Sequence, residues 1–149
     1  MTQEVVSGLT DEQAAAVAKL SLAAERGDGD AACQLGDRYR EATGGVRYSP
    51  KAAFRWYARS ALTGYPQGQN NVGACFEHGI GCVQSYAKAV SWYRKAAAQK
   101  LAYASSNLGH LYLKGQGVPA DKAVAVGWFE KALEQGDERA AEMVKELGG

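Results

Sequence analysis

The three tryptophans of this 149-residue chain, Trp56, Trp92 and Trp128, follow one another at intervals of 36 residues. A rare residue at a fixed interval indicates an internal repeat, and a period of about 20–50 residues constrains the fold more than any other pattern. Around each tryptophan an alanine stands three residues before it, an aromatic residue directly after it, and Arg or Lys three residues after it. The spacing therefore predicts three copies of one structural unit.

Each unit contains a second block of sequence, ahead of its tryptophan, that recurs in all three units. The blocks AACQLGDRY, GQNNVGACF and ASSNLGHLY begin at Ala31, Gly68 and Ala104. Apolar residues recur at steps of three and four in both kinds of block, which is typical of helices. Glycine-rich segments separate the two blocks, and Gly64 and Gly136 stand where a left-handed residue commonly ends a helix. Each unit is thus predicted to be helix, turn, helix.

One glycine lies inside each predicted first helix, at Gly36, Gly73 and Gly109. Glycine in a helix costs about 1 kcal/mol relative to alanine. A cost repeated three times indicates that a neighbouring helix approaches closely at this point, and we expect its large aromatic residue to lie there. We also expect the tryptophans to pack between successive helices rather than to bind a ligand.

The segments at both ends look like incomplete units. The first opens with a capping box, Thr10 with Gln13, and the last begins like a first helix but has Lys145 where the glycine should be. Polar replacements are typical of solenoid caps, whose outer face has no neighbour. The sequence predicts an all-α superhelix (solenoid) of eight helices, one domain over residues 1–149. Its expected parts are a capping helix at 10–26, repeats at 27–63, 64–99 and 100–135, and a capping helix at 136–147.

The third copy, LGHLYLKGQGVPADKAVAVGWFEKALEQG, resembles the Sel-one-like repeat (SLR) family, a tetratricopeptide-like class of helix-turn-helix solenoids. The resemblance rests on a helix-internal Leu-Gly, a Gly-x-Gly-Val turn and a tryptophan-bearing second helix, and it covers residues 27–136. The first copy carries one inserted residue in EATGGVRYSP, and Lys100 replaces the terminal glycine of the second. The resemblance implies a non-enzymatic scaffold or adaptor, often bacterial, that presents a curved surface to a peptide or a partner protein.

The first helices of tetratricopeptide-like arrays line the concave face. Counted from the helix-internal glycine, offsets −6, −3, +1, +4 and +5 are left to face this groove once the core positions are assigned. That these are merely solvated polar positions stays an alternative. Among the three cysteines only Cys33 falls on this face, so we expect its thiol to be reachable. The predicted partner-binding face consists of Asp30, Cys33, Asp37, Arg40, Glu41, Gln67, Asn70, Ala74, Glu77, His78, Tyr103, Ser106, His110, Leu113 and Lys114.

The stretch CFEHGIGC brings together Cys75, His78 and Cys82, all of zinc-ligand type. The repeat register favours another interpretation, because Cys75 aligns with Leu111 and Cys82 with Val118, so both are expected to be small buried residues. A small metal-dependent regulator or enzyme using this cluster, and a disulfide between the two cysteines, are kept as alternatives.

No catalytic constellation is recognisable in the sequence. Ser85 and Lys88 form a Ser-x-x-Lys pair, but its companion motifs are absent, and Ser85 aligns with Asp121 at a helix start, where both residue types cap helices. The histidines His78 and His110 have no partner at a known motif spacing, and the glycine turns lack the Lys-Ser/Thr of a phosphate loop. We therefore expect no catalytic residue, cofactor or metal.

Composition limits the partners and the compartment. A net charge of +1 gives no basic field for nucleic acid, and no run approaches the roughly 18 apolar residues of a membrane span. Three cysteines, an odd number, fit a reducing compartment, so we expect a cytoplasmic protein, or a periplasmic or secreted one if a leader has been removed. A monomer is favoured, with a homo-oligomer joined through the groove as the alternative.

Overall fold

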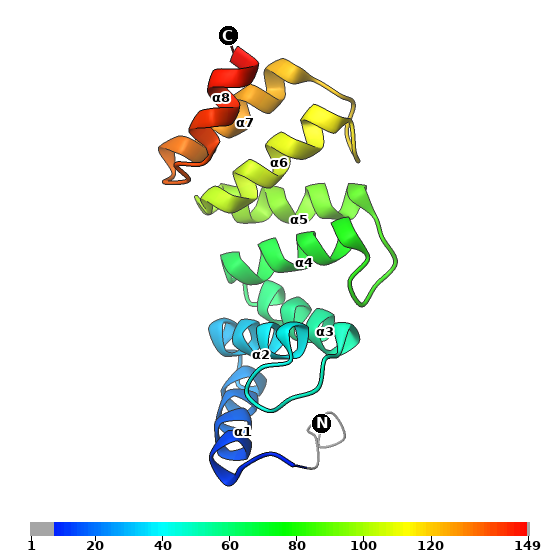
Figure 1. Cartoon of the computed structure of the whole chain (residues 1–149), viewed down its shortest axis with the longest axis vertical. Coiled ribbons are helices and arrows are strands. Elements are labelled where there is room, and N and C mark those ends of the chain that lie inside the picture. Colours follow the sequence, from blue (N-terminus) through cyan, green and yellow to red (C-terminus); the bar gives the residue numbers. More distant parts are fainter. Residues whose placement is uncertain (1–7, 149) are drawn as a thin grey trace.

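The computed structural model describes residues 8–148, and there the chain forms eight helices stacked along one axis (Figure 1). Successive helices pack as pairs, α2 with α3, α4 with α5 and α6 with α7, while α1 and α8 cover the two ends. This confirms the predicted all-α superhelix of three units. The helices are α1 (Asp11–Glu25), α2 (Gly29–Glu41), α3 (Pro50–Leu62), α4 (Pro66–His78), α5 (Tyr86–Ala98), α6 (Ala102–Lys114), α7 (Lys122–Glu134) and α8 (Ala140–Gly148).

Polar side chains cap the starts of most helices. Thr10 and Gln13 form the predicted capping box of α1. The second helix of each unit begins after a side chain that accepts a hydrogen bond from a backbone N–H of its first turn. These caps are Ser49 on Ala52 at 3.1 Å, Ser85 on Lys88 at 3.3 Å, and Asp121 on Val124 at 3.0 Å. Ser85 is therefore a helix cap, as its register predicts.

The helix-internal glycines are the contact points within each pair. The aromatic residue after each tryptophan is buried, and a Cβ added to the facing glycine would lie only 2.5–2.7 Å from its ring. Carbon atoms normally meet at about 3.5–4.0 Å, so only glycine fits. This confirms the expected close approach. The pairs are Gly36 with Tyr57, Gly73 with Tyr93, and Gly109 with Phe129.

The tryptophans join one unit to the next. Trp56 is 3% exposed, while Trp92 and Trp128 are half-buried. Trp92 packs against a core cluster contributed by α1 to α4, and Trp128 packs against a cluster contributed by α5 and α6, so each cluster spans a boundary between units. The expected structural role is confirmed. A cation three residues further along the helix lies over each indole, at 5.4 Å for Arg59, 4.2 Å for Lys95 and 5.2 Å for Lys131.

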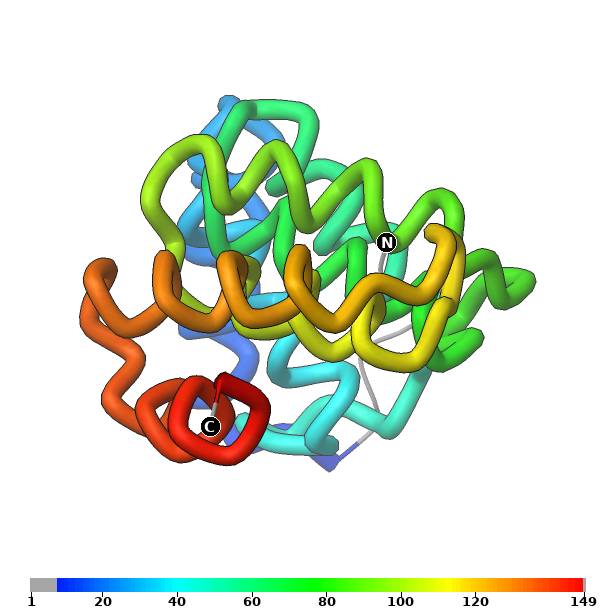
Figure 2. Tube along the Cα trace, turned by 90° about the horizontal axis from the view of Figure 1, so that it is seen from above, coloured from blue at the N-terminus to red at the C-terminus, as the bar shows by residue number. Residues whose placement is uncertain are grey.

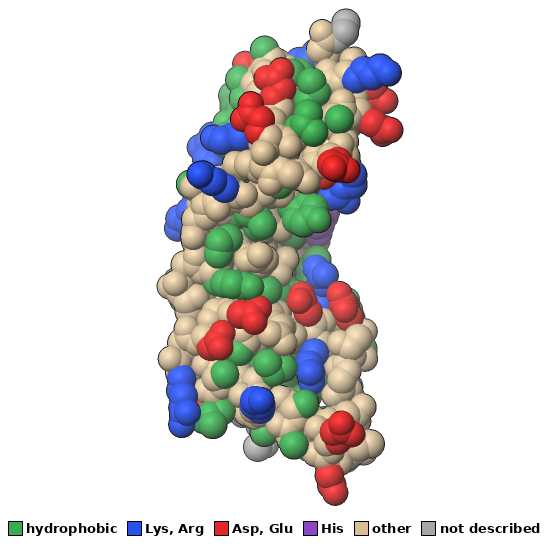
Figure 3. Space-filling model, turned by 90° about the vertical axis from the view of Figure 1, so that its left-hand side faces the viewer, with side chains coloured by type: hydrophobic (Ala, Val, Ile, Leu, Met, Phe, Trp, Pro, Cys, Tyr) green, Lys and Arg blue, Asp and Glu red, His purple; other side chains and the backbone are tan. Residues whose placement is uncertain are grey.

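The stack is curved, and one side of it is hollowed (Figure 3). The first helices α2, α4 and α6 lie toward this hollow, which faces the viewer in Figure 1, and α2 touches α4 directly past α3. Viewed along the long axis, successive pairs are rotated relative to one another, as in a superhelix (Figure 2). No helix between residues 8 and 148 is both long enough and apolar enough to cross a membrane.

Two turns place a residue other than glycine in the left-handed region. Ala42, at the end of α2, has a φ of 55°, although α4 and α6 end at glycines. Lys100, after α5, has a φ of 67°, where Gly64 and Gly136 follow the other second helices. A side chain costs about 1–2 kcal/mol in this conformation. At both departures from the repeat pattern the backbone is therefore strained locally, and the fold is unchanged.

Candidate functional site

The fifteen residues of the predicted partner-binding face lie on α2, α4 and α6, and only Cys33 among them is buried. Seven are exposed, namely Asp30, Glu41, Gln67, His78, Tyr103, His110 and Lys114. Seven are half-buried, namely Asp37, Arg40, Asn70, Ala74, Glu77, Ser106 and Leu113.

The prediction that the Cys33 thiol is reachable is wrong. The residue is 5% exposed, and Nδ2 of Asn71 donates a hydrogen bond to its Sγ at 3.2 Å. Burial, with a contribution from the charge of Asp37, raises the pKa of the thiol to about 11. Cys33 is therefore a packing residue between α2 and α4, and it offers no reactive group at neutral pH.

Hydrogen bonds between neighbouring units run along the first helices, and the sequence reasoning missed them. They occupy the groove position at offset −3 in every unit, so Cys33, Asn70 and Ser106 are in part structural. The sequence does contain a sign of these bonds, because asparagine follows the offset −3 position in the second and third units, at Asn71 and Asn107. The bonds are Asn71 to Cys33, Asn107 Nδ2 to Asn70 Oδ1 at 3.0 Å, and Ser106 Oγ to Asp137 Oδ2 at 2.7 Å.

Two of the groove carboxylates are held by tyrosines from the core. The Tyr57 hydroxyl donates to Asp37 at 2.5 Å, and the Tyr93 hydroxyl donates to Glu77 at 2.8 Å. Burial first, and these carboxylates second, raise the pKa of both phenols. The third unit has Phe129 instead, whose ring meets the edge of the His110 imidazole with a centroid distance of 4.9 Å. The groove thus changes character at its third unit.

A cleft of about 380 Å³ lies at this third unit, between α6, the α7–α8 connection and α8. The start of α6 and that connection lie side by side at the left of Figure 1. Three residues of the predicted face, Tyr103, Ser106 and His110, line the cleft. The remaining wall includes apolar surface from Phe129, Ala140 and Met143 together with Asn107, Asp137 and Arg139.

The polar wall of the cleft is organised by Asp137, whose side chain is only 4% exposed. Its carboxylate accepts hydrogen bonds from Ser106 Oγ at 2.7 Å and from the backbone N and Nε of Arg139 at 3.2 and 3.1 Å. Burial alone raises the pKa of Asp137, but these hydrogen bonds outweigh it and lower the pKa. For His110, burial and the nearby Lys114 charge lower the pKa, so the imidazole is neutral at pH 7.

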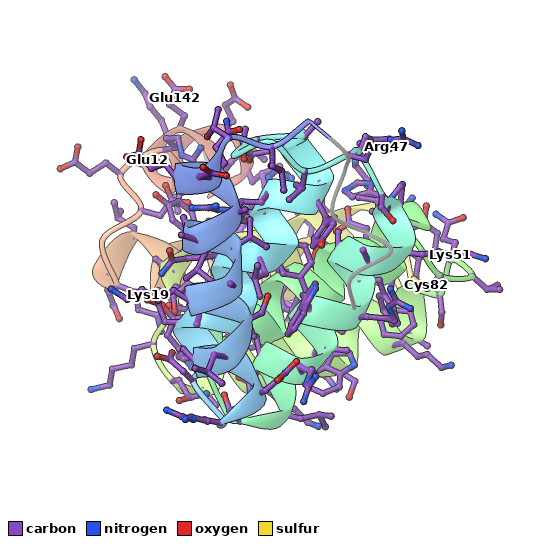
Figure 4. All side chains as sticks on the ribbon, turned by 90° about the horizontal axis from the view of Figure 1, so that it is seen from below. Glu12, Lys19, Arg47, Lys51, Cys82 and Glu142 are labelled. Carbon is purple, nitrogen blue, oxygen red and sulfur yellow. The ribbon has the colours of Figure 1, made fainter. Side chains whose placement is uncertain are left out.

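The residues of the suggested metal cluster do not form a ligand set. Cys75 is buried, Cys82 is half-buried with its Sγ 3.4 Å from the Cys75 carbonyl oxygen, and all three cysteines of the chain are free. Burial raises the pKa of Cys75 to about 12, and His78 lies 3.4 Å from Glu77. Between residues 8 and 148 no three His, Cys, Asp or Glu side chains gather to hold a metal ion. Both cysteines pack at the core positions that their register predicts; Figure 4 shows Cys82 at one edge of the stack.

The family follows from the repeats themselves. The model of the Sel1 repeat matches three consecutive segments, residues 29–65, 66–101 and 102–137. The chain belongs to the Sel1 repeat family. Proteins of the Sel1 repeat family typically mediate protein interactions and are usually non-catalytic. The resemblance seen in the third copy is thereby confirmed across all three units.

Solved structures of Sel1 repeat proteins resemble this chain. A protective antigen of uropathogenic Escherichia coli that displays an SLR fold is 38% identical, with a TM-score of 0.78 over 83% of this chain and 26% of its own. A Sel1 repeat protein from Oxalobacter formigenes is 33% identical, with a TM-score of 0.74 over 80% of this chain and 49% of its own. The chain thus spans about a quarter and about half of these two proteins. Helicobacter pylori cysteine rich protein B, 23% identical with a TM-score of 0.65 over 84% of this chain and 94% of its own, shares the fold. A comparison with curated proteins gave no match.

Proposed function

We propose that this chain is a non-enzymatic interaction module that binds a peptide segment or a partner protein on the concave face formed by α2, α4 and α6. The observation that carries the proposal is the cleft of about 380 Å³ at the third unit, lined in part by Tyr103, Ser106 and His110. Its volume is within the range of about 300–1,000 Å³ that is usual for ligand pockets. A curved helical array with such a recess suits an extended chain.

The polar groups around the cleft support the proposal because two of them have no hydrogen-bond partner within residues 8–148. Between residues 8 and 148, neither the Tyr103 hydroxyl nor the His110 imidazole forms a hydrogen bond, although both side chains are exposed. By contrast, Asp37 and Glu77 in the first two units already accept bonds from tyrosines. The third unit therefore offers the most freely available donors and acceptors for a partner.

The proposal contains no chemical step. The Ser85 hydroxyl, the one candidate nucleophile of the sequence, accepts the Lys88 backbone N–H as a helix cap. The thiols of Cys33 and Cys75 are buried with raised pKa values, which disfavours the reactive thiolate. Binding without catalysis is the function that the geometry supports best.

We also propose that the chain acts as a monomer in a reducing compartment such as the cytoplasm. Its three free cysteines support the reducing compartment. Light scattering of the purified protein tests the monomer, since a stable dimer would double the mass. Fractionation of the source cells, with detection by antibody, tests the compartment.

The binding proposal is tested by affinity capture from the source cells followed by mass spectrometry. The test variant is the double substitution Tyr103→Ala, His110→Ala. The matched control is Tyr48→Ala, since Tyr48 is 65% exposed and Tyr103 is 55% exposed, but Tyr48 lies in the α2–α3 connection, outside the concave face. We expect one partner to be captured by the wild type and by the control and lost from the double variant. A partner retained by all three proteins would place binding elsewhere and overturn the proposal.

A further inference from the structure

The cleft at the third unit combines an apolar floor with a fixed cation. Phe129 and Ala140 are buried beneath it and Met143 is half-buried at its side. Arg139, at the wall formed by the α7–α8 connection, is the most exposed of the charged lining groups, with 77% of its side chain accessible. Such a pairing of apolar surface with one oriented polar group is typical of a specific binding pocket.

Arg139 is held in place although it is exposed. Its Nε donates to Asp137 Oδ1 at 3.1 Å, and its guanidinium carbon lies 5.1 Å from the centre of the Tyr103 ring. Asp137 is itself fixed by Ser106, so the arrangement is continuous with α6. An exposed arginine usually loses side-chain freedom when it binds, but here the conformation is already selected. The two terminal nitrogens of the guanidinium remain available to an acceptor, since only Nε is bonded to protein among the described residues.

The charges around the cleft favour an anionic group as that acceptor. Among the described residues, Arg139 is the one cation that lines the cleft, and Lys114 on α6 carries a second positive charge near His110. The carboxylate of Asp137 is buried and already accepts three hydrogen bonds. Glu77, which also acts on His110, accepts the hydroxyl of Tyr93 and does not line the cleft. A guanidinium fork matches a carboxylate with two parallel hydrogen bonds.

We propose that the cleft binds a segment of a partner protein in which a large apolar side chain lies next to an Asp or Glu. The apolar side chain enters the cleft against Met143 and the exposed rings of Tyr103 and His110, above buried Phe129 and Ala140. The neighbouring carboxylate accepts hydrogen bonds from Arg139. The inference rests on the proposed function, because it names the partner chemistry for the same concave face. The carboxylate is that of a side chain within the segment, since the concave face continues from the cleft over α4 and α2 and can accommodate further chain there.

Three short peptides with blocked ends test the inference by nuclear magnetic resonance titration of the ¹⁵N-labelled full chain. The probe is acetyl-Gly-Ser-Phe-Glu-Ser-Gly-amide, and the comparison peptides carry Gln in place of its Glu or Ala in place of its Phe. We expect the probe to shift the amide signals of Ser106, His110 and Arg139, and both comparison peptides to bind about five- to tenfold more weakly. Equal binding of all three peptides, or shifts confined to other parts of the chain, would overturn the inference.

A cycle of two substitutions separates recognition from loosening of the cleft. Arg139→Gln should remove the preference for Glu over Gln in the peptide, because the partner of the carboxylate is gone. A merely structural disturbance would weaken both peptides by the same factor and leave the ratio unchanged, which would refute the assigned role. Arg59→Gln is the matched control, since Arg59 also lies over an aromatic ring, that of Trp56 at 5.4 Å, but on α3. It should keep the full preference.

The two proposals fail separately. One outcome is a cellular partner that is lost with the double variant Tyr103→Ala, His110→Ala but bound by Arg139→Gln as well as by the wild type. That result would support binding on the concave face and overturn the inference of an acidic segment. A partner whose binding is unaffected by the double variant would overturn the proposal that the concave face binds it, whatever the result with the peptides.

Discussion

Replacing Gly73 with alanine tests the physical reason for the glycines inside the first helices. Gly73 lies in α4, in the central unit, and an added Cβ would be 2.7 Å from two ring atoms of Tyr93. The ring cannot retreat, because Tyr93 is 1% exposed and its hydroxyl is bonded to Glu77. The substitution therefore forces α4 and α5 apart by about 1 Å to restore an ordinary carbon contact.

Two opposing effects set the magnitude. Alanine is favoured over glycine in a helix by about 1 kcal/mol. Overpacking of a buried contact costs about 1–3 kcal/mol. We expect Gly73→Ala to lower the free energy of unfolding by up to about 2 kcal/mol, the difference between the two effects, which corresponds to a fall in Tm of up to roughly 8 °C for a chain of this size.

The chain provides its own control at Gly127. This glycine is exposed in α7, its φ is ordinary for a helix, and a Cβ would meet no atom within 4 Å. Gly127→Ala should therefore raise the free energy of unfolding by about 0.5–1 kcal/mol. Urea unfolding of both variants, followed by far-ultraviolet circular dichroism, measures the difference. If Gly73→Ala proved as stabilising as Gly127→Ala, close packing would not be the reason for the helix-internal glycines.

Three further predictions concern strain, charge and thiols. Lys100→Gly should stabilise the chain by about 0.5–1 kcal/mol in urea unfolding, because it relieves a side chain at a φ of 67°; an unchanged midpoint would contradict this. Asp137→Asn should destabilise it by about 1–3 kcal/mol at pH 7. Because folding lowers the pKa of Asp137, the stability advantage of the wild type over Asp137→Asn is full above about pH 4–5, where the unfolded carboxyl is ionised, and it declines as the pH falls further. Thermal unfolding should therefore show a large difference in Tm between the two proteins at pH 7 and a small one at pH 2.5. With a thiol reagent at pH 8, half-buried Cys82 should react first, while Cys33 and Cys75 react only on unfolding; a fast Cys33 would disprove its burial.

The fold was predictable because the repeat supplies the same evidence three times. A single glycine inside a helix is ambiguous, but Gly36, Gly73 and Gly109, each in register with an aromatic residue, indicate one contact made in every unit. The repeat register also assigned Cys75 to the core, although its spacing to His78 and Cys82 resembles a zinc motif. Periodicity is effective here because neighbouring units bury equivalent positions.

The candidate site was less predictable because it depends on contacts between units rather than on repeated positions. Offsets from a glycine place Cys33 on the groove side of α2, yet the next unit covers it through Asn71. Asp137 and Arg139, which shape the cleft, lie beyond the third repeat as predicted and were taken only as part of a cap. A rule based on one helix cannot see which side chains the following helix brings against it.

The position of the cleft itself follows from one difference between the units. In the first two, a tyrosine hydroxyl reaches from the core to a groove carboxylate, Tyr57 to Asp37 and Tyr93 to Glu77. Phe129 has no hydroxyl to satisfy, and the third unit has no carboxylate at either of the positions that Asp37 and Glu77 occupy. Its buried ring instead packs against the imidazole of His110 at the base of the cleft. The third unit therefore lacks both the hydroxyl and its acidic partner, and the cleft lies at this unit, where Asp137 positions a cation beside it.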